Sequence, residues 1–336
     1  MSGTSIVKRA SIAVGALGGL AGAAYVAQRT AAQRMRRAPD GGAARALDAA
    51  VYVDRRLDTH DRGSIYVVEN GKRDDPPIVL SHGVTLSART WFHQLEDLPK
   101  QGFRAIAFDH RGHGQSVLGE AGHSLENLAE DVKTVVEGLD LHDAVLVGHS
   151  LGGVAVQSFV IAYPEIAAER VAGIVLLSTL AKTAFGSHST RTKARLEKLM
   201  GTVPDVQWLW EGPNAGFLAA RIGFGKVARP SHVELVRRMM AECPAETRRD
   251  APRVLVGLDL THDLPNVHVP TLVIGGTADV LTPPSESKRI ARLIPGARLE
   301  LMRGGGHMLM LEQTEALDQI IVDFAREVRA LRNSAA

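Results

Sequence analysis

Five apolar runs separated by helical patterns constrain the fold of this chain more than any other feature. A strand with one solvent-exposed face alternates apolar and polar residues, whereas these runs are almost continuously apolar. They lie within residues 76–83, 103–116, 143–150, 171–179 and 270–280. Strands of this kind, joined by helices, are typical of a parallel sheet that is covered on both faces. The sequence therefore predicts an α/β fold with a mostly parallel sheet.

The strand–helix alternation breaks in the middle of the chain and then resumes. From about Leu180 to Val269 the pattern is mostly helical, which predicts an inserted helical cap. The predicted organisation is a leader and linker at 1–45, a first core part at 46–180, the cap at 181–268 and a second core part at 269–336. Within the cap, the spacing of Ser231 and Glu234 predicts a capping box at the start of a helix.

Composition excludes several classes of protein. The 39 Lys and Arg residues nearly balance the 37 Asp and Glu residues, so the chain lacks the basic excess that a nucleic-acid partner requires. Its single cysteine, Cys243, excludes an internal disulfide framework and a cysteine-based zinc site.

The stretch Gly-His-Ser-Leu-Gly-Gly at residues 148–153 joins a predicted buried strand to a predicted helix. A lone Gly-x-Ser-x-Gly is a weak motif, but this setting is the one that a nucleophile elbow requires. The small residues around Ser150 permit a strained turn, and the backbone N–H of Leu151 lies at the helix N-terminus, where negative charge is favoured. Ser150 is therefore the predicted nucleophile, and a turn without chemistry is the alternative.

A serine nucleophile needs a base, and the base needs a carboxylate that fixes its tautomer. His307 follows a predicted strand and a glycine run, and Asp279 follows the preceding strand. Both therefore lie at the carboxyl-end edge of the sheet, which Ser150 shares. Asp263 is a weaker candidate for the acid because it lies at the cap boundary. The chain order Ser150, Asp279, His307 agrees with one known arrangement of such triads.

Over residues of about 50 to 332 the chain resembles the α/β-hydrolases. Ser-His-Gly-Val at 81–84 resembles the oxyanion-loop motif of that superfamily, residues 108–116 its glycine-rich loop, and residues 148–153 its elbow. The resemblance implies a triad of Ser150, Asp279 and His307. It also implies an oxyanion hole made by the backbone N–H groups of Val84 and Leu151.

The same resemblance implies a reaction class. Members that open epoxides or displace halide carry Asp at the elbow, so Ser150 favours acyl transfer through an acyl-enzyme. The expected protein is a serine hydrolase for carboxylic esters, lipid-like ones such as monoacylglycerols or lysophospholipids, without metal or organic cofactor. The alternatives are a cofactor-free haloperoxidase or perhydrolase, a carbon–carbon bond hydrolase, and a ligand-binding member with little turnover. A single Gly-Val after His82, in place of a longer glycine run, leaves the acyl preference open.

Several further side chains have expected roles around this site. His149 in the elbow and Trp208 and Trp210 in the cap are candidate substrate-binding residues. The cap also carries Phe217, Phe224, Met239 and Met240. His82 is expected to hydrogen-bond the oxyanion loop. Asp109 and Arg111 are expected to clamp their own turn rather than to act in catalysis.

The N-terminus carries 18 uncharged residues at 10–27, flanked on both sides by Lys and Arg. This length just reaches that of a membrane-spanning helix, although eleven of the residues are Gly or Ala. A membrane anchor is expected, and a cleaved signal peptide for export or a surface-lying or disordered leader are the alternatives. The four arginines that follow favour a cytoplasmic catalytic domain. Residues 1 to about 38 are expected to take no part in catalysis.

Overall fold

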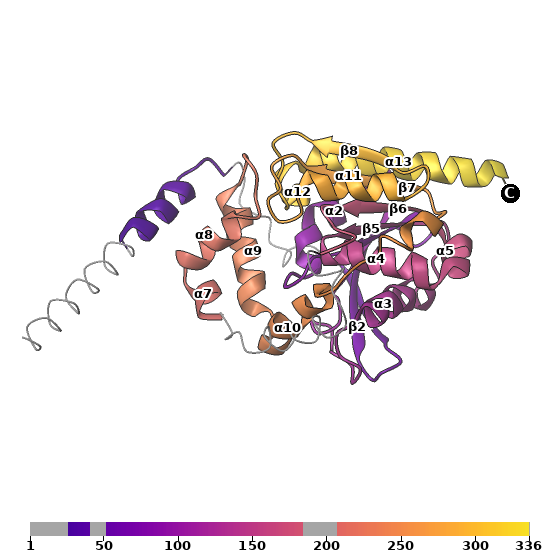
Figure 1. Ribbon diagram of the computed structural model, residues 1–336, viewed down its shortest axis with the longest axis horizontal. Coiled ribbons are helices and arrows are strands. Elements are labelled where there is room, and N and C mark those ends of the chain that lie inside the picture. Colours follow the sequence, from indigo (N-terminus) through magenta and orange to yellow (C-terminus); the bar gives the residue numbers. More distant parts are fainter. Residues whose placement is uncertain (1–25, 41–51, 184–206, 336) are drawn as a thin grey trace, which may run out of the picture.

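An eight-stranded sheet forms the centre of the protein (Figure 1). The computed structural model describes residues 26–40, 52–183 and 207–335. The strand order is β1-β2-β4-β3-β5-β6-β7-β8. The strands are β1 (Val53–Asp58), β2 (Ser64–Asn70), β3 (Pro77–Ser81), β4 (Arg104–Phe108), β5 (Ala144–His149), β6 (Val171–Leu177), β7 (Thr271–Gly276) and β8 (Arg298–Met302). β2 pairs antiparallel with β1 and with β4, and every other pairing is parallel.

Both faces of the sheet are buried, which explains the continuous apolar runs. Strands β4 to β7 are buried along their whole length. Side chains that alternate along a strand enter two separate cores, so that Val145 and Val147 lie in one and Leu146 lies in the other. The predicted α/β fold with a mostly parallel sheet is confirmed.

Helices supply the rest of each core. Residues of α3, α4 and α11 belong to one core, and residues of α2 and α13 belong to the other. The core helices are α2 (Phe92–Asp97), α3 (Leu125–Gly138), α4 (Leu151–Ala162), α5 (Pro164–Arg170), α11 (Pro284–Leu293), α12 (Leu309–Glu312) and α13 (Thr314–Ala335). Short 3₁₀ helices are η2 (Ala88–Trp91), η3 (Pro99–Gln101), η4 (Ala251–Leu255) and η5 (Leu264–Asn266).

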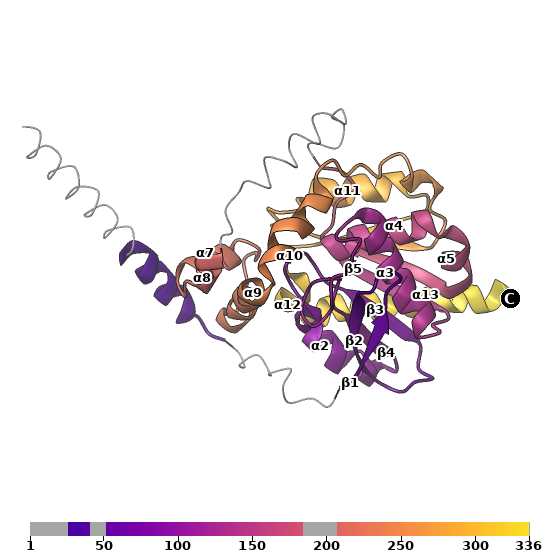
Figure 2. The same ribbon diagram turned by 90° about the horizontal axis from the view of Figure 1, so that it is seen from below.

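A group of short helices lies beside the core between β6 and β7 in sequence (Figures 1 and 2). It consists of α7 (Gln207–Glu211), α8 (Ala215–Arg221), α9 (Pro230–Glu242) and α10 (Ala245–Asp250). The chain enters and leaves this cap at one place, where Lys182 and Asp259 form a β-bridge and a 2.9 Å ion pair.

The capping-box prediction for α9 is wrong. Pro230 occupies the first turn of α9 and Arg229 is its N-cap, so Ser231 lies inside the helix. The hydroxyl of Ser231 donates to the carboxylate of Asp40 at 2.7 Å, and Glu234 pairs with Arg237 at 2.7 Å. Ser231 therefore bonds a residue that is distant in sequence, and Glu234 bonds a neighbour on the same helix, in place of the predicted pairing between the two.

Among the described helices, none is by itself both long and apolar enough to cross a bilayer. Helices α4 and α5 pass that test only as a pair, and they bend by 104° between them. Residues 10–25 of the predicted anchor lie outside the described part of the chain.

Candidate active site

Ser150 occupies a strained turn between β5 and α4. Its backbone has φ +54° and ψ −117°, a combination that residues other than glycine rarely adopt. Two contacts with the neighbouring strand β6 and the loop after it hold the turn. The Ser150 N–H donates to the Leu177 carbonyl at 3.1 Å, and the Ser150 carbonyl accepts the Thr179 hydroxyl at 2.7 Å. The backbone therefore holds the serine at the carboxyl end of the sheet.

Glycines beside Ser150 let the helix pack closely on the sheet. A Cβ on Gly153 would lie only 2.6 Å from Cβ of Thr179. A Cβ on Gly148 would collide with the backbone of Gly152. These contacts explain why small residues surround the serine in sequence.

Asp279 and His307 meet after β7 and β8. The Nδ1 atom of His307 lies 2.9 Å from Oδ2 of Asp279, and both side chains are buried. An Nδ1–H that donates to this carboxylate leaves Nε2 unprotonated and able to accept a proton. The carboxylate that meets His307 is thus that of Asp279, whereas Asp263 precedes η5.

Asp279 accepts three further hydrogen bonds from the turn that follows it. The N–H groups of Leu281 and Thr282 donate to Oδ1 at 2.8 and 2.9 Å, and the Thr282 hydroxyl donates to Oδ2 at 2.7 Å. Burial alone would raise the pKa of Asp279, but the hydrogen bonds from His307 and Thr282 outweigh it and lower the pKa below its usual value. The carboxylate therefore stays ionised beside the imidazole.

Thr282 is a site residue that the sequence analysis missed. Its Oγ1 lies 3.1 Å from Nδ1 of His307 as well as 2.7 Å from Asp279, and the side chain is buried. Because the hydroxyl proton goes to the carboxylate, the oxygen lone pairs face the Nδ1–H of His307. A threonine three residues after an aspartate is the pattern that could have indicated this turn.

A cavity of about 400 Å³ lies between the core and the cap and contains Ser150 and His307. Most of its other wall residues are apolar. From the core they include Val84, Leu180, Leu281 and Met308, and from the cap Trp210, Ala220, Ile222, Val236 and Met240. The arrangement provides an apolar chamber beside a serine, an imidazole and a carboxylate.

The three candidate substrate-binding residues have different positions relative to the cavity. Trp210 lines the cavity, but Trp208 is 68 % exposed and is absent from its walls. Trp208 and Trp210 are two residues apart on the helix α7, so their side chains point in nearly opposite directions. The prediction for Trp208 is therefore not supported by its position in α7.

His149 also lines the cavity but has a second contact. It is fully buried, and its Nε2–H donates to the carbonyl oxygen of His307 at 2.9 Å. Burial holds the pKa of His149 well below its ordinary value, so the ring is neutral. His149 thus ties the loop of His307 to the elbow of Ser150.

The two predicted oxyanion-hole residues come from different segments near Ser150. Leu151 is the first residue of α4, and Val84 lines the cavity on the loop after β3. A Cβ on the neighbouring Gly83 would lie 3.2 Å from Cβ of Ser150, so glycine permits the close approach of this loop. His82 fastens the loop as expected, because its Nδ1–H donates to the Gly83 carbonyl at 2.7 Å and its Nε2 accepts the His110 N–H at 3.0 Å.

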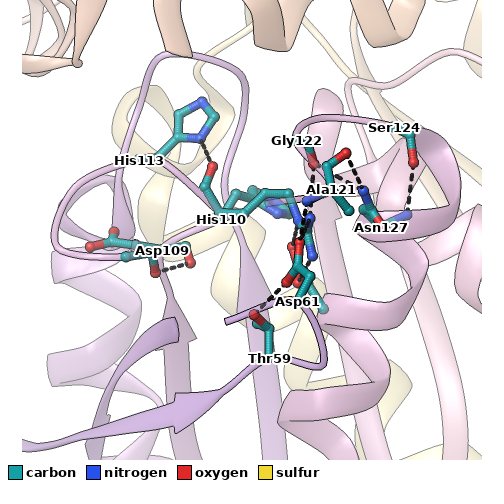
Figure 3. A network of polar contacts seen from close by, with 12 residues as sticks. Thr59, Asp61, Asp109, His110, His113, Ala121, Gly122, Ser124 and Asn127 are labelled. Carbon is teal, nitrogen blue, oxygen red and sulfur yellow. Dashed lines mark hydrogen bonds and ion pairs between the residues drawn. The ribbon is translucent and has the colours of Figure 1, made fainter. Parts of the chain in front are cut away.

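A network of polar contacts holds the loop at 109–116 (Figure 3). The carboxylate of Asp109 accepts the N–H groups of Ala88 and Gln115 at 2.7 and 2.8 Å. The guanidinium of Arg111 donates to both oxygens of Asp131, at 2.7 and 2.8 Å, and to Asp61 at 3.0 Å. Asp109 therefore clamps its own turn, as expected, through the N–H of Gln115. The expectation that Arg111 clamps the same turn is wrong, because its partners Asp61 and Asp131 lie in other segments.

The fold and the juxtaposition of Ser150, His307 and Asp279 define this protein as an α/β-hydrolase. The family described as "Serine aminopeptidase, S33" matches residues 73–314, and the chain belongs to this family.

Several characterised proteins are similar in sequence. The chain is 31 % identical over 279 residues to a bifunctional esterase/perhydrolase of Acinetobacter calcoaceticus, and 30 % identical over 277 residues to a non-heme chloroperoxidase of Burkholderia pyrrocinia. Each match covers 80 % of this chain and 98 % of the relative.

Solved structures agree with this assignment. A putative aryl esterase from Burkholderia cenocepacia is 25 % identical and matches with a TM-score of 0.69, over 83 % of this chain and 100 % of that one. An esterase from Exiguobacterium antarcticum, at 22 % identity, shares the fold with a TM-score of 0.70, over 82 % of this chain and 100 % of that one. The protein is therefore a hydrolase-family member with esterases and haloperoxidases among its relatives.

Proposed function

We propose that this protein is a serine hydrolase that cleaves carboxylic esters through an acyl-enzyme. The observation that carries the proposal is a strained Ser150 in the same apolar cavity as His307, whose Nδ1 is held by Asp279. This is the combination of nucleophile, base and orienting acid that acyl transfer requires.

The chemistry follows from these roles. Ser150 Oγ attacks the ester carbonyl carbon while its proton passes to Nε2 of His307. The backbone N–H groups of Val84 and Leu151 stabilise the oxyanion. Collapse of the intermediate expels the alcohol, which takes the proton from His307, and a water molecule activated by the same histidine then hydrolyses the acyl-enzyme.

The substrate is proposed to be a small, lipophilic ester, of the monoacylglycerol or lysophospholipid type. The support is the apolar wall of the cavity, whose volume of about 400 Å³ lies within the usual range for small-molecule sites. Each methylene that the wall removes from water contributes up to about 0.8 kcal/mol, which is roughly a fourfold gain in affinity.

Nitrophenyl esters of increasing acyl length test this proposal. The value of kcat/KM should rise from the acetate to the octanoate, with a burst of nitrophenol equal to the concentration of active sites. A strict preference for acetate would contradict the lipophilic substrate. Absence of turnover on every ester, with intact binding of an apolar ligand, would favour a ligand-binding role.

A perhydrolase or haloperoxidase activity is the second candidate, supported by the names of the two relatives. In that reaction hydrogen peroxide replaces water as the attacking group, so the acyl-enzyme releases a peroxy acid and free Ser150. The peroxy acid then oxidises halide in solution. Bromide oxidation that requires both hydrogen peroxide and a carboxylic acid would reveal it, and Ser150→Ala would abolish it.

We also propose association with a membrane through the uncharged residues 10–27, with the catalytic domain on the cytoplasmic side. The full chain should sediment with membranes and resist extraction by high salt. Recovery of a soluble protein without its leader would favour export instead.

A further inference from the structure

Residues 26–40 precede the sheet in sequence and pack against the cap. Residues 26–36 are helical, and this helix lies beside α8 in both views (Figures 1 and 2). Ala32 is fully buried. The guanidinium of Arg36 lies 4.5 Å from the centre of the Phe217 ring, and its Nη1 donates to Oδ1 of Asn214 at 2.9 Å. The segment is thus bound at the start of α8.

Asp40 makes a second attachment at the start of α9. Its Oδ2 accepts the N–H of Ser231 at 2.8 Å, and its Oδ1 accepts the hydroxyl of Ser231 at 2.7 Å. The N-cap residue of α9, Arg229, makes no side-chain cap. A carboxylate at this position satisfies a free helix N–H and has a favourable interaction with the helix dipole. Asp40 therefore caps a helix 191 residues further along the chain.

Both attached helices form the wall of the catalytic cavity. Ala219 and Ala220 of α8, and Val236 and Met240 of α9, line it. A movement of either helix would change the width of the chamber beside Ser150. The attachments of Arg36 and Asp40 lie at the N-terminal ends of these same helices.

This segment precedes the part of the chain that the family model matches, which begins at residue 73. The chain covers 98 % of each of the two relatives with only 80 % of its own length, and residues 26–40 precede β1, the first strand of the sheet. The expectation from the sequence was that residues 1 to about 38 take no part in catalysis, whereas residues 26–40 contact two helices that line the catalytic cavity.

We propose that residues 26–40 are a brace that fixes α8 and α9 and thereby sets which acyl chains the cavity accepts. The effect on acyl chains rests on the proposed ester hydrolysis, whereas the effect on the cap helices does not. Arg36 and Asp40 are positioning residues that act through the cap.

The test uses the full chain with Arg36→Ala and Asp40→Ala, singly and together, and Arg34→Ala as the control on the exposed side of the same helix. Loss of charge-assisted hydrogen bonds should accelerate amide hydrogen exchange in α8 and α9 on the order of tenfold, with α3 unchanged. The KM for the octanoate ester should rise several-fold, while kcat and KM for the acetate ester stay as in the wild type. Arg34→Ala should change none of these values.

If the double variant folds poorly, Ser231→Ala replaces it in the test. This substitution removes only the hydrogen bond from the Ser231 hydroxyl to Asp40. Unchanged exchange in α8 and α9 of the double variant would overturn the brace. A uniform rise in exchange over the whole protein, or an equal loss on both esters, would also overturn it. Faster exchange confined to the cap, in a protein that hydrolyses no ester, would support the brace and refute only the proposed function.

Discussion

Replacement of Thr282 by valine removes one hydroxyl from the link between Asp279 and His307. Valine has nearly the size and shape of threonine, so the buried position stays filled, and the backbone N–H of residue 282 still reaches Asp279. The lost contacts are the 2.7 Å bond to Oδ2 of Asp279 and the 3.1 Å approach to Nδ1 of His307.

The expected loss in kcat follows from the charge on Asp279, because a hydrogen bond to a charged group is stronger than one between neutral groups. A hydrogen bond to a charged group contributes about 1.5 to 3 kcal/mol, and the loss of about 1.4 kcal/mol of it in the transition state lowers a rate tenfold. His307 keeps its own bond to Asp279, so only part of the full value is lost. We expect kcat for ester hydrolysis to fall about tenfold with KM nearly unchanged, because the hydroxyl supports the imidazole rather than the substrate.

Steady-state kinetics on one nitrophenyl ester and the NMR resonance of the His307 Nδ1 proton are the assays. Thr282→Ser, which keeps the hydroxyl, is the matched control and should restore both kcat and the position of the resonance. A valine variant with full kcat would refute the reasoning. So would a serine variant as impaired as the valine variant, because packing would then explain the loss.

Two further predictions concern the acid and the stability. Asp279→Asn should leave the protein folded but lower turnover by a factor on the order of 10⁴, as expected for the wrong imidazole tautomer, while Asp263→Asn should have little effect; the reverse order in ester assays would move the acid to Asp263. Burial keeps the pKa of six described histidines below the ordinary value. Four of them are completely buried, namely His82, His110, His113 and His149, and the other two are His123 and His232. The unfolded chain binds protons at these histidines as the pH falls below about 6.5. Each of the four completely buried histidines therefore lowers the free energy of unfolding by about 1.4 kcal/mol per pH unit. Asp109 and Asp318, whose pKa burial raises to about 6 and about 7, act in the opposite direction. Urea unfolding should therefore show that the protein loses stability as the pH falls from about 6 to about 4.5, because the histidines outnumber the two aspartates, and constant stability over that range would contradict this account.

Features encoded by neighbouring residues could be predicted from the sequence. The sheet follows from its continuous apolar runs, and the elbow follows from a serine among small residues between a strand and a helix. Asp279 and His307 follow from the rule that parallel strands end at one edge. Each of these inferences needs only a local pattern and the general geometry of α/β proteins.

Contacts between distant segments could not be predicted in the same way. Asp61 lies 50 residues from Arg111, and Asp40 lies 191 residues from Ser231. No local spacing indicates these partners. The local pattern predicted that Ser231 and Glu234 form a capping box, but the structure pairs Ser231 with the distant Asp40.

Helical phase limited the prediction of the cap residues. Trp208 and Trp210 are equally apolar in sequence, but only the position of α7 decides which of them faces the cavity. The N-terminal segment poses the same problem, because its charged residues suggest a solvated leader until their partners in the cap are known.

Labelling of the full chain with a fluorophosphonate tests the central claim most directly. The probe phosphonylates a serine only where a base and an oxyanion site activate it, and mass spectrometry of the digested protein locates the adduct. The account predicts one adduct per chain on Ser150, and none in Ser150→Ala. An adduct on another residue, or undiminished labelling of Ser150→Ala, would contradict the assignment of Ser150 as the nucleophile.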